Sequence, residues 1–190
     1  MATWWIGLGG GVLLWTLLEY VLHRWAFHRR VLGRLVAREH VRHHAKVDYF
    51  APVWPKLALA AIVLPLVMLA AGLVLGWALG SSVPAGVVVG WLVYEWIHRR
   101  IHVAAPVGGL GRLGAYGRWA RRHHLHHHFG RADMNHGVST PIWDLVFGTF
   151  VRPESVRVPR AHVTKFPWLL EAREGTPHIA RDWASEYRLV

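Results

Sequence analysis

Two long apolar blocks constrain this chain of 190 residues more than any other feature. Residues 3–22 carry one charge, Glu19, and residues 57–79 carry none. A helix of about 20 apolar residues crosses the roughly 30 Å hydrocarbon core of a bilayer. Both blocks are therefore predicted to be membrane-spanning helices. A shorter block, 83–97, carries Glu95 near its end and is a weak third candidate by itself.

The basic residues predict how these segments cross the bilayer. All 22 Lys and Arg residues fall within 23–56 and 98–190, whereas the opposite side, 1–2 and an outer turn at 80–82, has none. Because basic residues are retained on the cytoplasmic side, we expect the N-terminus outside and the C-terminus in the cytoplasm, and in a bacterium the membrane would be the inner one. Anionic headgroups account for the net charge of +11, so nucleic acid is not an expected partner.

Ten of the 15 histidines stand in four short clusters. Their members are His23 and His28, then His40, His43 and His44, then His98 and His102, and finally His124, His127 and His128. On an α-helix, the spacings HxxHH and HxxxH place their rings on one face, because each residue turns by about 100°. His23 and His28 would lie about 140° apart on such a helix, so they either reach different metals or sit across a helix end.

Histidines that cluster in this way are typical of a metal site. Imidazole binds iron, zinc, copper and nickel alike, so the spacing does not identify the metal. The chain has no cysteine, which excludes thiolate ligands and disulfides. With three spans, all four clusters lie at the cytoplasmic face of the membrane, whereas two spans would separate them. The clusters therefore support 83–97 as a third span and predict a shared metal site.

Two carboxylates precede the clusters. Glu19 and Glu95 each lie about one helical turn before a cluster histidine. Metal-bound histidines usually pass their second ring N–H to a carboxylate or a carbonyl. We therefore expect both acids to orient ligands, with direct ligation as an alternative for Glu95.

The clusters and their surroundings resemble the fatty acid hydroxylase superfamily, which includes sterol desaturase-like enzymes, and most nearly the fatty acid 2-hydroxylases. The resemblance covers about residues 19–150. It rests on Glu19-Tyr20-Val21-Leu22-His23-Arg24 with His28, His40-Val41-Arg42-His43-His44 with Asp48 and Pro52, Tyr94-Glu95 with His98 and His102, and His123–His128 with Gly137-Val138-Ser139-Thr140 and Trp143-Asp144.

The downstream part of this resemblance chooses between two registers of the last cluster. HxxHH can start at His123 or at His124. Alignment of residues 137–144 with the family pattern favours His124, which leaves His123 and His126 as supporting neighbours or without a role. The family often has an aromatic residue where this chain has His136, which implies an additional polar group near the substrate.

The resemblance also implies a fold, an activity and cofactors. It implies an all-α membrane-embedded domain, residues 1–150, with about three spanning helices and a cytoplasmic histidine-rich cap, followed by a polar cytoplasmic tail, 151–190, at the membrane surface. The ten clustered histidines would hold two iron ions, which zinc can replace in purified samples. With O2 as co-substrate, the site would hydroxylate a lipid acyl chain, with C2 as a candidate carbon. Electrons would come from a separate ferredoxin-like or cytochrome b5-like donor with its reductase.

Three other functions stay open on the sequence alone. A carotenoid ring hydroxylase has a similar histidine content, but its third cluster is usually HxxxxH, whereas His98 and His102 form HxxxH. A lipid desaturase could use the same metal site. A membrane metal transporter or metal-storage protein would need ligands near the bilayer midplane. Transport is disfavoured because residues 57–97 contain no His, Asp or Glu before Glu95.

Overall fold

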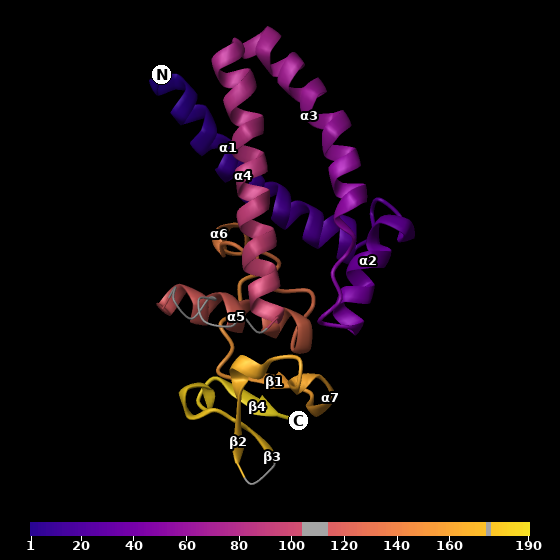
Figure 1. Ribbon diagram of the computed structural model, residues 1–190, viewed down its shortest axis with the longest axis vertical. Helices are drawn as coiled ribbons and strands as arrows, with labels where there is room; N and C mark the ends of the chain where they lie inside the picture. Colours follow the sequence, from indigo (N-terminus) through magenta and orange to yellow (C-terminus); the bar gives the residue numbers. More distant parts are fainter. Residues whose placement is uncertain (104–113, 174–175) are drawn as a thin grey trace.

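Three long helices form the apolar part of the molecule in a computed structural model, which describes residues 1–103, 114–173 and 176–190 (Figure 1). They are α1 (Ala2–Val21), α3 (Val53–Leu75) and α4 (Trp77–His102). All three are long and apolar enough to cross a membrane, which confirms the three predicted spans. On α3, Leu66 is 62% and Leu73 is 74% exposed. A helix that is apolar on every side is stable in lipid rather than in water.

The outer turn lies at Gly76, earlier in the chain than the predicted turn at 80–82. Gly76 has a φ of 84°, which residues with a side chain rarely adopt. Ser81 and Ser82, expected in the turn, lie inside α4 instead. Their hydroxyls donate to backbone carbonyls one helical turn earlier, at 2.7 Å and 2.6 Å. These bonds satisfy the serine side chains within an apolar helix, so the helix continues through them.

Small residues let α1 cross α4 at close range (Figure 1). Gly11 of α1 lies against Gly86 of α4, and a methyl group added at either glycine would overlap the backbone of the other helix. One turn earlier, Gly7 faces the Ser82 hydroxyl, which a methyl group at Gly7 would overlap. The two helices therefore form the most extensive contact between elements of the molecule. This contact fixes the C-terminal end of α1 relative to the C-terminal end of α4.

The chain leaves α1 through a π-helix and then reverses. The π-helix η1 (Leu22–His28) continues α1 directly and ends with the Arg29 N–H bonded to the Arg24 carbonyl at 3.2 Å. A short connection then leads into α2 (Arg34–Ala45), which packs against η1. α2 carries the second histidine cluster back toward the ends of α1 and α4.

A polar cap closes this end of the molecule. In Figure 1, α5 (Gly114–Phe129) runs across the end of α4, and the α3–α4 hairpin points away from it. The short helix α6 (Ile142–Val146) follows and contacts α1. The two chain termini lie at opposite ends of the molecule, as an odd number of spans requires (Figure 1). The direction in which the chain crosses a membrane stays a prediction.

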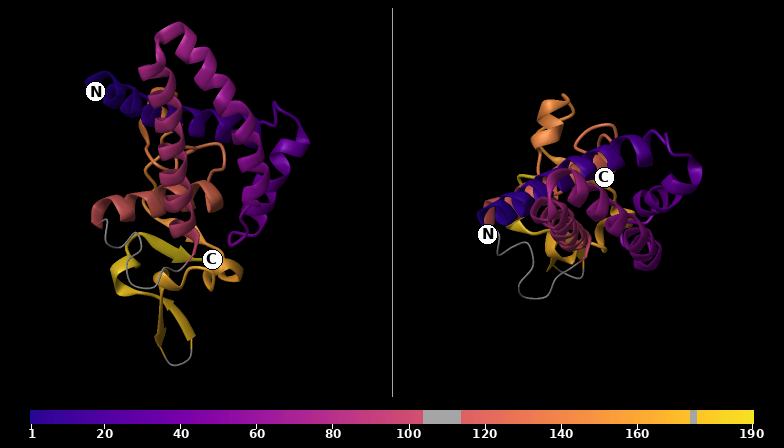
Figure 2. Two further views of the ribbon diagram at one scale, coloured as in Figure 1. Left: turned by 45° about the horizontal axis from the view of Figure 1, so that its top comes forward. Right: turned by 90° about the horizontal axis from the view of Figure 1, so that it is seen from above.

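The last forty residues fold onto the cap, a packing that no pattern in the sequence predicted. They form β1 (Val156–Val158), α7 (Arg160–Val163), η3 (Pro167–Leu169), β2 (Leu170–Arg173), β3 (Thr176–Ile179), η4 (Arg181–Trp183) and β4 (Tyr187–Leu189). β1 pairs with β4 in parallel and β2 with β3 in antiparallel orientation. In Figure 2 (left) these strands lie beyond α5, on the side away from the α3–α4 hairpin.

The tail has its own buried side chains and shares a core with the cap. Val156, Phe166 and Tyr187 are at most 1% exposed and cluster with Ile101 of α4 and Leu125 of α5. We expected a polar segment because strands of three or four residues are too short to give a periodic apolar pattern. The molecule is mostly helical, and its described part adds four short strands to the predicted all-α fold.

Candidate metal centre

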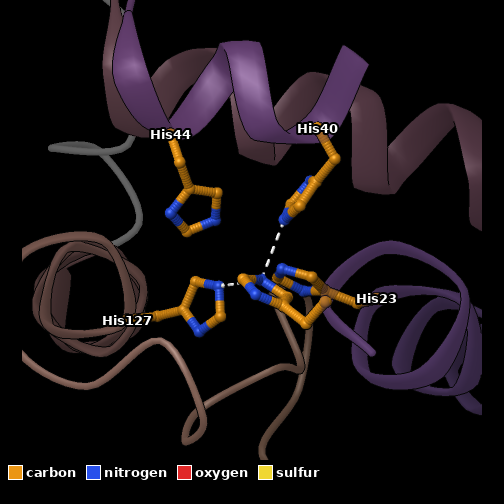
Figure 3. Close-up of side chains that lie close together, drawn as sticks. His23, His40, His44 and His127 are labelled. Carbon is orange, nitrogen blue, oxygen red and sulfur yellow. Dashed lines mark hydrogen bonds between the residues drawn. The ribbon is translucent and has the colours of Figure 1, made fainter. Parts of the chain in front are cut away.

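The ten clustered histidines converge into two groups of five. The first histidine group consists of His23, His28, His40, His44 and His127, and the second of His43, His98, His102, His124 and His128. Within each group, one nitrogen from every ring lies within 4.8 Å of the others, close enough to hold a metal ion. Six of the ten residues are buried, and the other four are half-buried. Figure 3 shows His40 and His44 pointing from one helix toward His23 and His127.

Two of the helices contribute to both groups, which places the groups side by side. On α2, His40 and His44 join the first group while His43 joins the second. On α5, His127 joins the first group while His124 and His128 join the second. Rings from different groups stack directly, since the His44 and His128 centroids are 4.1 Å apart. The two groups therefore form one site with two adjacent centres rather than two distant sites.

The π-helix explains how His23 and His28 reach the same group. On an α-helix their rings would diverge by about 140°, and we predicted different metals or a helix end between them. In η1 the hydrogen bonds run from residue i to i+5, so side chains five positions apart return to one face. Their ring centroids are 5.1 Å apart. π-Helical turns are rare and are often found at functional sites.

Backbone carbonyls set the orientation of three of the rings. Nδ1 of His23 lies 2.5 Å from the His136 carbonyl, and Nδ1 of His127 lies 2.7 Å from the Met134 carbonyl. In the second group, Nδ1 of His43 lies 2.7 Å from the Tyr49 carbonyl. A carbonyl oxygen only accepts, so each Nδ1 carries the proton and each Nε2 keeps its lone pair. The lone pairs are therefore available inside the groups.

The nitrogens inside the groups fit a bound cation. Nε2 of His28 lies 2.9 Å from Nε2 of both His40 and His127. Because His127 holds its proton on Nδ1, its Nε2 presents a lone pair at that contact. Nε2 of His23 and Nε2 of His44 are buried without a hydrogen-bond partner in the described structure. Buried lone pairs that face one another without partners are costly unless a cation lies between them.

Burial keeps the extramembrane imidazoles neutral. It lowers the pKa of His43 to about 4 and that of His44 to about 3, from an ordinary value of 6.5. Burial, followed by the neighbouring imidazoles, also holds the pKa values of His40, His124 and His127 well below 6.5. Neutral imidazole is the form that binds a metal. These rings are therefore ready to act as ligands at neutral pH.

The two predicted carboxylates lie close to the groups but do not contact their rings. Glu19 accepts hydrogen bonds from the Val138 N–H, the Ser139 N–H at 2.9 Å and the Ser139 hydroxyl at 2.5 Å. Glu95 pairs with Lys56 and with Arg99 and belongs to neither group. For His23, the His136 carbonyl rather than Glu19 accepts the Nδ1 N–H.

The three additional histidines have different positions. His123 is buried and its Nε2 lies 3.3 Å from Asp144. His126 is half-buried and outside both groups, with Nε2 unpaired in the described structure. His136 is buried with its ring 5.4 to 5.7 Å from three rings of the first group, and its carbonyl holds His23. The additional polar group predicted at 136 therefore borders the first histidine group.

Asp144 is a structural residue for which the sequence predicted no role. It is fully buried on α6 and accepts hydrogen bonds from the N–H groups of His136 and Gly137 and from the Thr149 hydroxyl, each at 2.8 Å. Burial alone would raise its pKa, but these bonds and His123 hold the pKa below the ordinary value. The Trp143-Asp144 doublet was visible as part of the resemblance, but nothing in the sequence showed which backbone it would hold.

Comparisons with known proteins agree with this geometry. The family model described as fatty acid hydroxylase matches residues 8–149. Human fatty acid 2-hydroxylase is 33% identical over 146 residues, which are 73% of this chain and 38% of that protein. Dihydroceramide fatty acyl 2-hydroxylase FAH1 of Arabidopsis thaliana is 28% identical over 155 residues, 77% of this chain and 61% of that protein.

A solved structure has the same fold over most of the chain. It is described as full-length Scs7p with only its hydroxylase domain visible. The TM-score is 0.61 at 26% identity, over 80% of this chain and 57% of that one. The chain spans about two fifths of the length of the mammalian relatives it matches.

Proposed function

The chain belongs to the fatty acid hydroxylase family, and on that premise we propose that it is a membrane-bound oxygenase that hydroxylates the acyl chain of a lipid. The proposed ligands are the ten residues of the two histidine groups, which would hold two iron ions. C2 of the acyl chain is the proposed carbon, because the curated relatives are named as fatty acid or fatty acyl 2-hydroxylases.

One observation carries this proposal, the convergence of ten imidazoles into two adjacent groups beside the ends of spanning helices. A nitrogen-only ligand set suits iron and also zinc, copper or nickel, so the choice of iron follows the family. When bound, two iron ions would supply the reduction of O2 that attack on an unactivated C–H bond requires. The balanced reaction converts one C–H bond, one O2, two electrons and two protons into one C–OH group and one water.

The chain itself holds and shields this chemistry. Backbone carbonyls fix the rings of His23, His43 and His127, so their lone pairs point into the groups. Aromatic side chains limit the access of water to the second group, since Phe50 lies 5.6 Å and Tyr94 lies 5.4 Å from the His98 ring. Both groups sit where spanning segments end, so an acyl chain could reach them from the bilayer.

The same placement argues against the metal-transport alternative. Among the described residues, the candidate ligands on α4 lie in its last two turns, and α3 contributes none. A transport pathway would need ligands near the middle of the bilayer. We also propose the predicted orientation, with the cap in the cytoplasm, and a separate electron donor of the ferredoxin or cytochrome b5 class.

Lipid mass spectrometry on expressing cells tests the proposal. His127→Ala combined with His128→Ala removes one candidate ligand from each group. We expect acyl chains that gain one oxygen atom in cells that express the wild type, and no such chains in cells that express the double mutant. Fragmentation would locate the hydroxylated carbon. His178→Ala is the matched control, because this histidine is exposed and belongs to neither group.

Each other outcome points elsewhere. Acyl chains that lose two hydrogens without gaining oxygen would identify a desaturase with the same metal site. Oxygenated carotenoid in a carotene-producing host, with unchanged acyl chains, would identify a carotenoid hydroxylase. Metal flux into vesicles with no product in either pool would contradict an oxygenase altogether.

A further inference from the structure

A cleft of about 430 Å³ opens in the cap, between α5 and the segment that follows α6. Its walls include Arg118, Trp119, Arg122, His123, Phe150 and Arg152. In Figure 1 both α5 and the strands beside it lie at the end of the molecule away from the α3–α4 turn. The cleft is therefore on the side that the proposed orientation exposes to the cytoplasm.

The cleft is positively charged. Three arginines line it, against one acid, Glu186, which pairs with Arg118 at 2.6 Å and with Arg122 at 3.8 Å. Arg152 is exposed, and no ion pair or hydrogen bond to its side chain is found in the described part of the chain. Guanidinium groups bind carboxylates in a planar, bidentate geometry, so an acidic partner surface fits this cleft better than a neutral one.

The inner wall of the cleft leads to the histidine groups. His123 lies in this wall, 2% exposed, with its ring 4.9 Å from Trp119 and 5.7 Å from Phe150 by centroid distance. The next residue in the chain is His124 of the second histidine group, 4.8 Å by centroid from His98. Aromatic rings thus line the way from a basic surface to His123, and from His123 the backbone continues directly into a candidate metal ligand, His124.

The proposed reaction needs two electrons, and the chain has no cysteine that could supply them by dithiol oxidation. We propose that this cleft is the docking site of an acidic one-electron carrier protein, whose carboxylates contact Arg152 and the rim of Arg118 and Arg122. Two reduced carrier molecules dock in turn, and each is oxidised by one electron, which would pass by way of His123 to the bound iron. This inference rests on the proposed function for its need of electrons, but its test does not depend on a lipid product.

The test follows the reoxidation of a reduced plant-type [2Fe–2S] ferredoxin by the anaerobic protein, loaded with iron and oxidised to the ferric state, without lipid substrate. We expect a rate that saturates with ferredoxin and an apparent Kd that weakens at least about tenfold between about 20 mM and about 300 mM salt. Arg152→Glu should weaken that Kd by about tenfold at low salt, because it reverses a charge at the contact. Arg160→Glu makes the same change on the exposed α7, outside the cleft, and should match the wild type.

Dithionite, which needs no docking, should reduce all three proteins equally and shows that the variants are folded and loaded. The inference is overturned if Arg152→Glu and Arg160→Glu behave alike, or if dithionite reduces the wild type while ferredoxin does not. If Arg152→Glu alters the KM for lipid and leaves the ferredoxin kinetics unchanged, the cleft binds a lipid headgroup, and the inference is overturned as well. Salt-dependent reduction by ferredoxin with no lipid product would support docking while contradicting the proposed hydroxylase.

Discussion

The two histidine groups are built from similar residues but are held in place by different means. In the first group, His23 and His127 are bonded to carbonyls of one loop, at His136 and Met134. That loop is in turn held by carboxylates, since Asp144 accepts from its N–H groups and Glu19 accepts from the residues that follow. The first group therefore depends on a network of hydrogen bonds that spans distant parts of the chain.

The second group depends more on helices and packing. His98 and His102 are one turn apart on α4, and Nδ1 of His102, His124 and His128 has no hydrogen-bond partner in the described structure. Aromatic rings surround it instead, with Phe166 at 6.2 Å and Phe50 at 6.0 Å from His102. A site held by hydrogen bonds should fail when one hub is removed, whereas a site held by packing should weaken gradually.

Removal of the Asp144 carboxylate should have the largest effect and should act on the first group. Asp144→Ala leaves two buried N–H groups without an acceptor, which costs about 1–3 kcal/mol each, and frees the loop that carries His136. Loss of a residue that orients the metal ligands without binding the metal typically weakens metal affinity about 10–100-fold. We therefore expect the bound iron, measured by elemental analysis, to fall from about two to about one per chain. Asp144→Asn keeps one acceptor oxygen and should restore part of the loss.

Double variants show which group has lost its metal. Added to Asp144→Ala, His28→Ala removes a ligand from the group that is already impaired and should cost little further iron. His102→Ala removes a ligand from the other group and should abolish iron binding. Equal losses from both combinations would mean that Asp144 supports the two groups alike, and the proposed contrast would be wrong.

Removal of an aromatic neighbour should have a smaller effect, and should act more on the second group than on the first. Phe50→Ala opens space beside His98 and His102 of the second group, whereas Phe27→Ala does so beside His40 of the first, where the rings stack at 5.2 Å. Both phenylalanines are half-buried. We expect Phe50→Ala to weaken iron affinity of the second group by about tenfold and Phe27→Ala by less, because hydrogen bonds still hold the first group. Chelator-driven release, followed spectroscopically, measures both, and a larger effect at Phe27 would reverse the assignment.

Helical spacing predicted part of the centre, and a simple regularity accounts for how the clusters divide. Among the ten clustered histidines, every pair at i and i+4 stays in one group, as His40 with His44 and His124 with His128 do. The i+3 residue of each HxxHH cluster, His43 or His127, lies about 100° from the last member and joins the other group. We predicted a shared face for each cluster, but the faces are wide enough to serve two neighbouring centres.

Other features depended on contacts that no local pattern records. The π-helix that aligns His23 with His28 has no known spacing signal, and it is positioned by the glycine-mediated contact of α1 with α4. The carbonyls that orient His23 and His127 can belong to any residue type, so the sequence could not identify them. The carboxylates were predicted as orienting groups because they lie one turn from histidines, yet Glu19 orients a backbone loop instead.

Acidification should give the smallest and most gradual effect, and its sign follows from burial. The pKa of His43, in the second group, is about 4 and that of His44, in the first, is about 3, against 6.5 for an exposed imidazole. Below pH 6.5 the unfolded chain binds protons that the folded chain does not. The unfolding free energy of the metal-free protein therefore decreases as the pH is lowered, and the contribution of these imidazoles to it is fully present above pH 6.5. We expect the unfolding midpoint after chelation to fall by roughly 5–10 °C between about pH 7 and about pH 5.

Substitution by glutamine, which does not titrate, separates the two groups in this experiment. His43→Gln and His44→Gln should each reduce the fall in the midpoint by a similar amount between pH 7 and pH 5, since both folded pKa values lie below that range. Below about pH 4 the two variants should diverge. Folded His43 then takes up its proton and causes no further loss of stability, whereas His44 stays unprotonated in the folded protein and causes further loss down to about pH 3. A midpoint that does not change with pH in the wild type would mean that these imidazoles are accessible to protons in the folded protein, and the neutral, preorganised ligand set would be wrong for both groups.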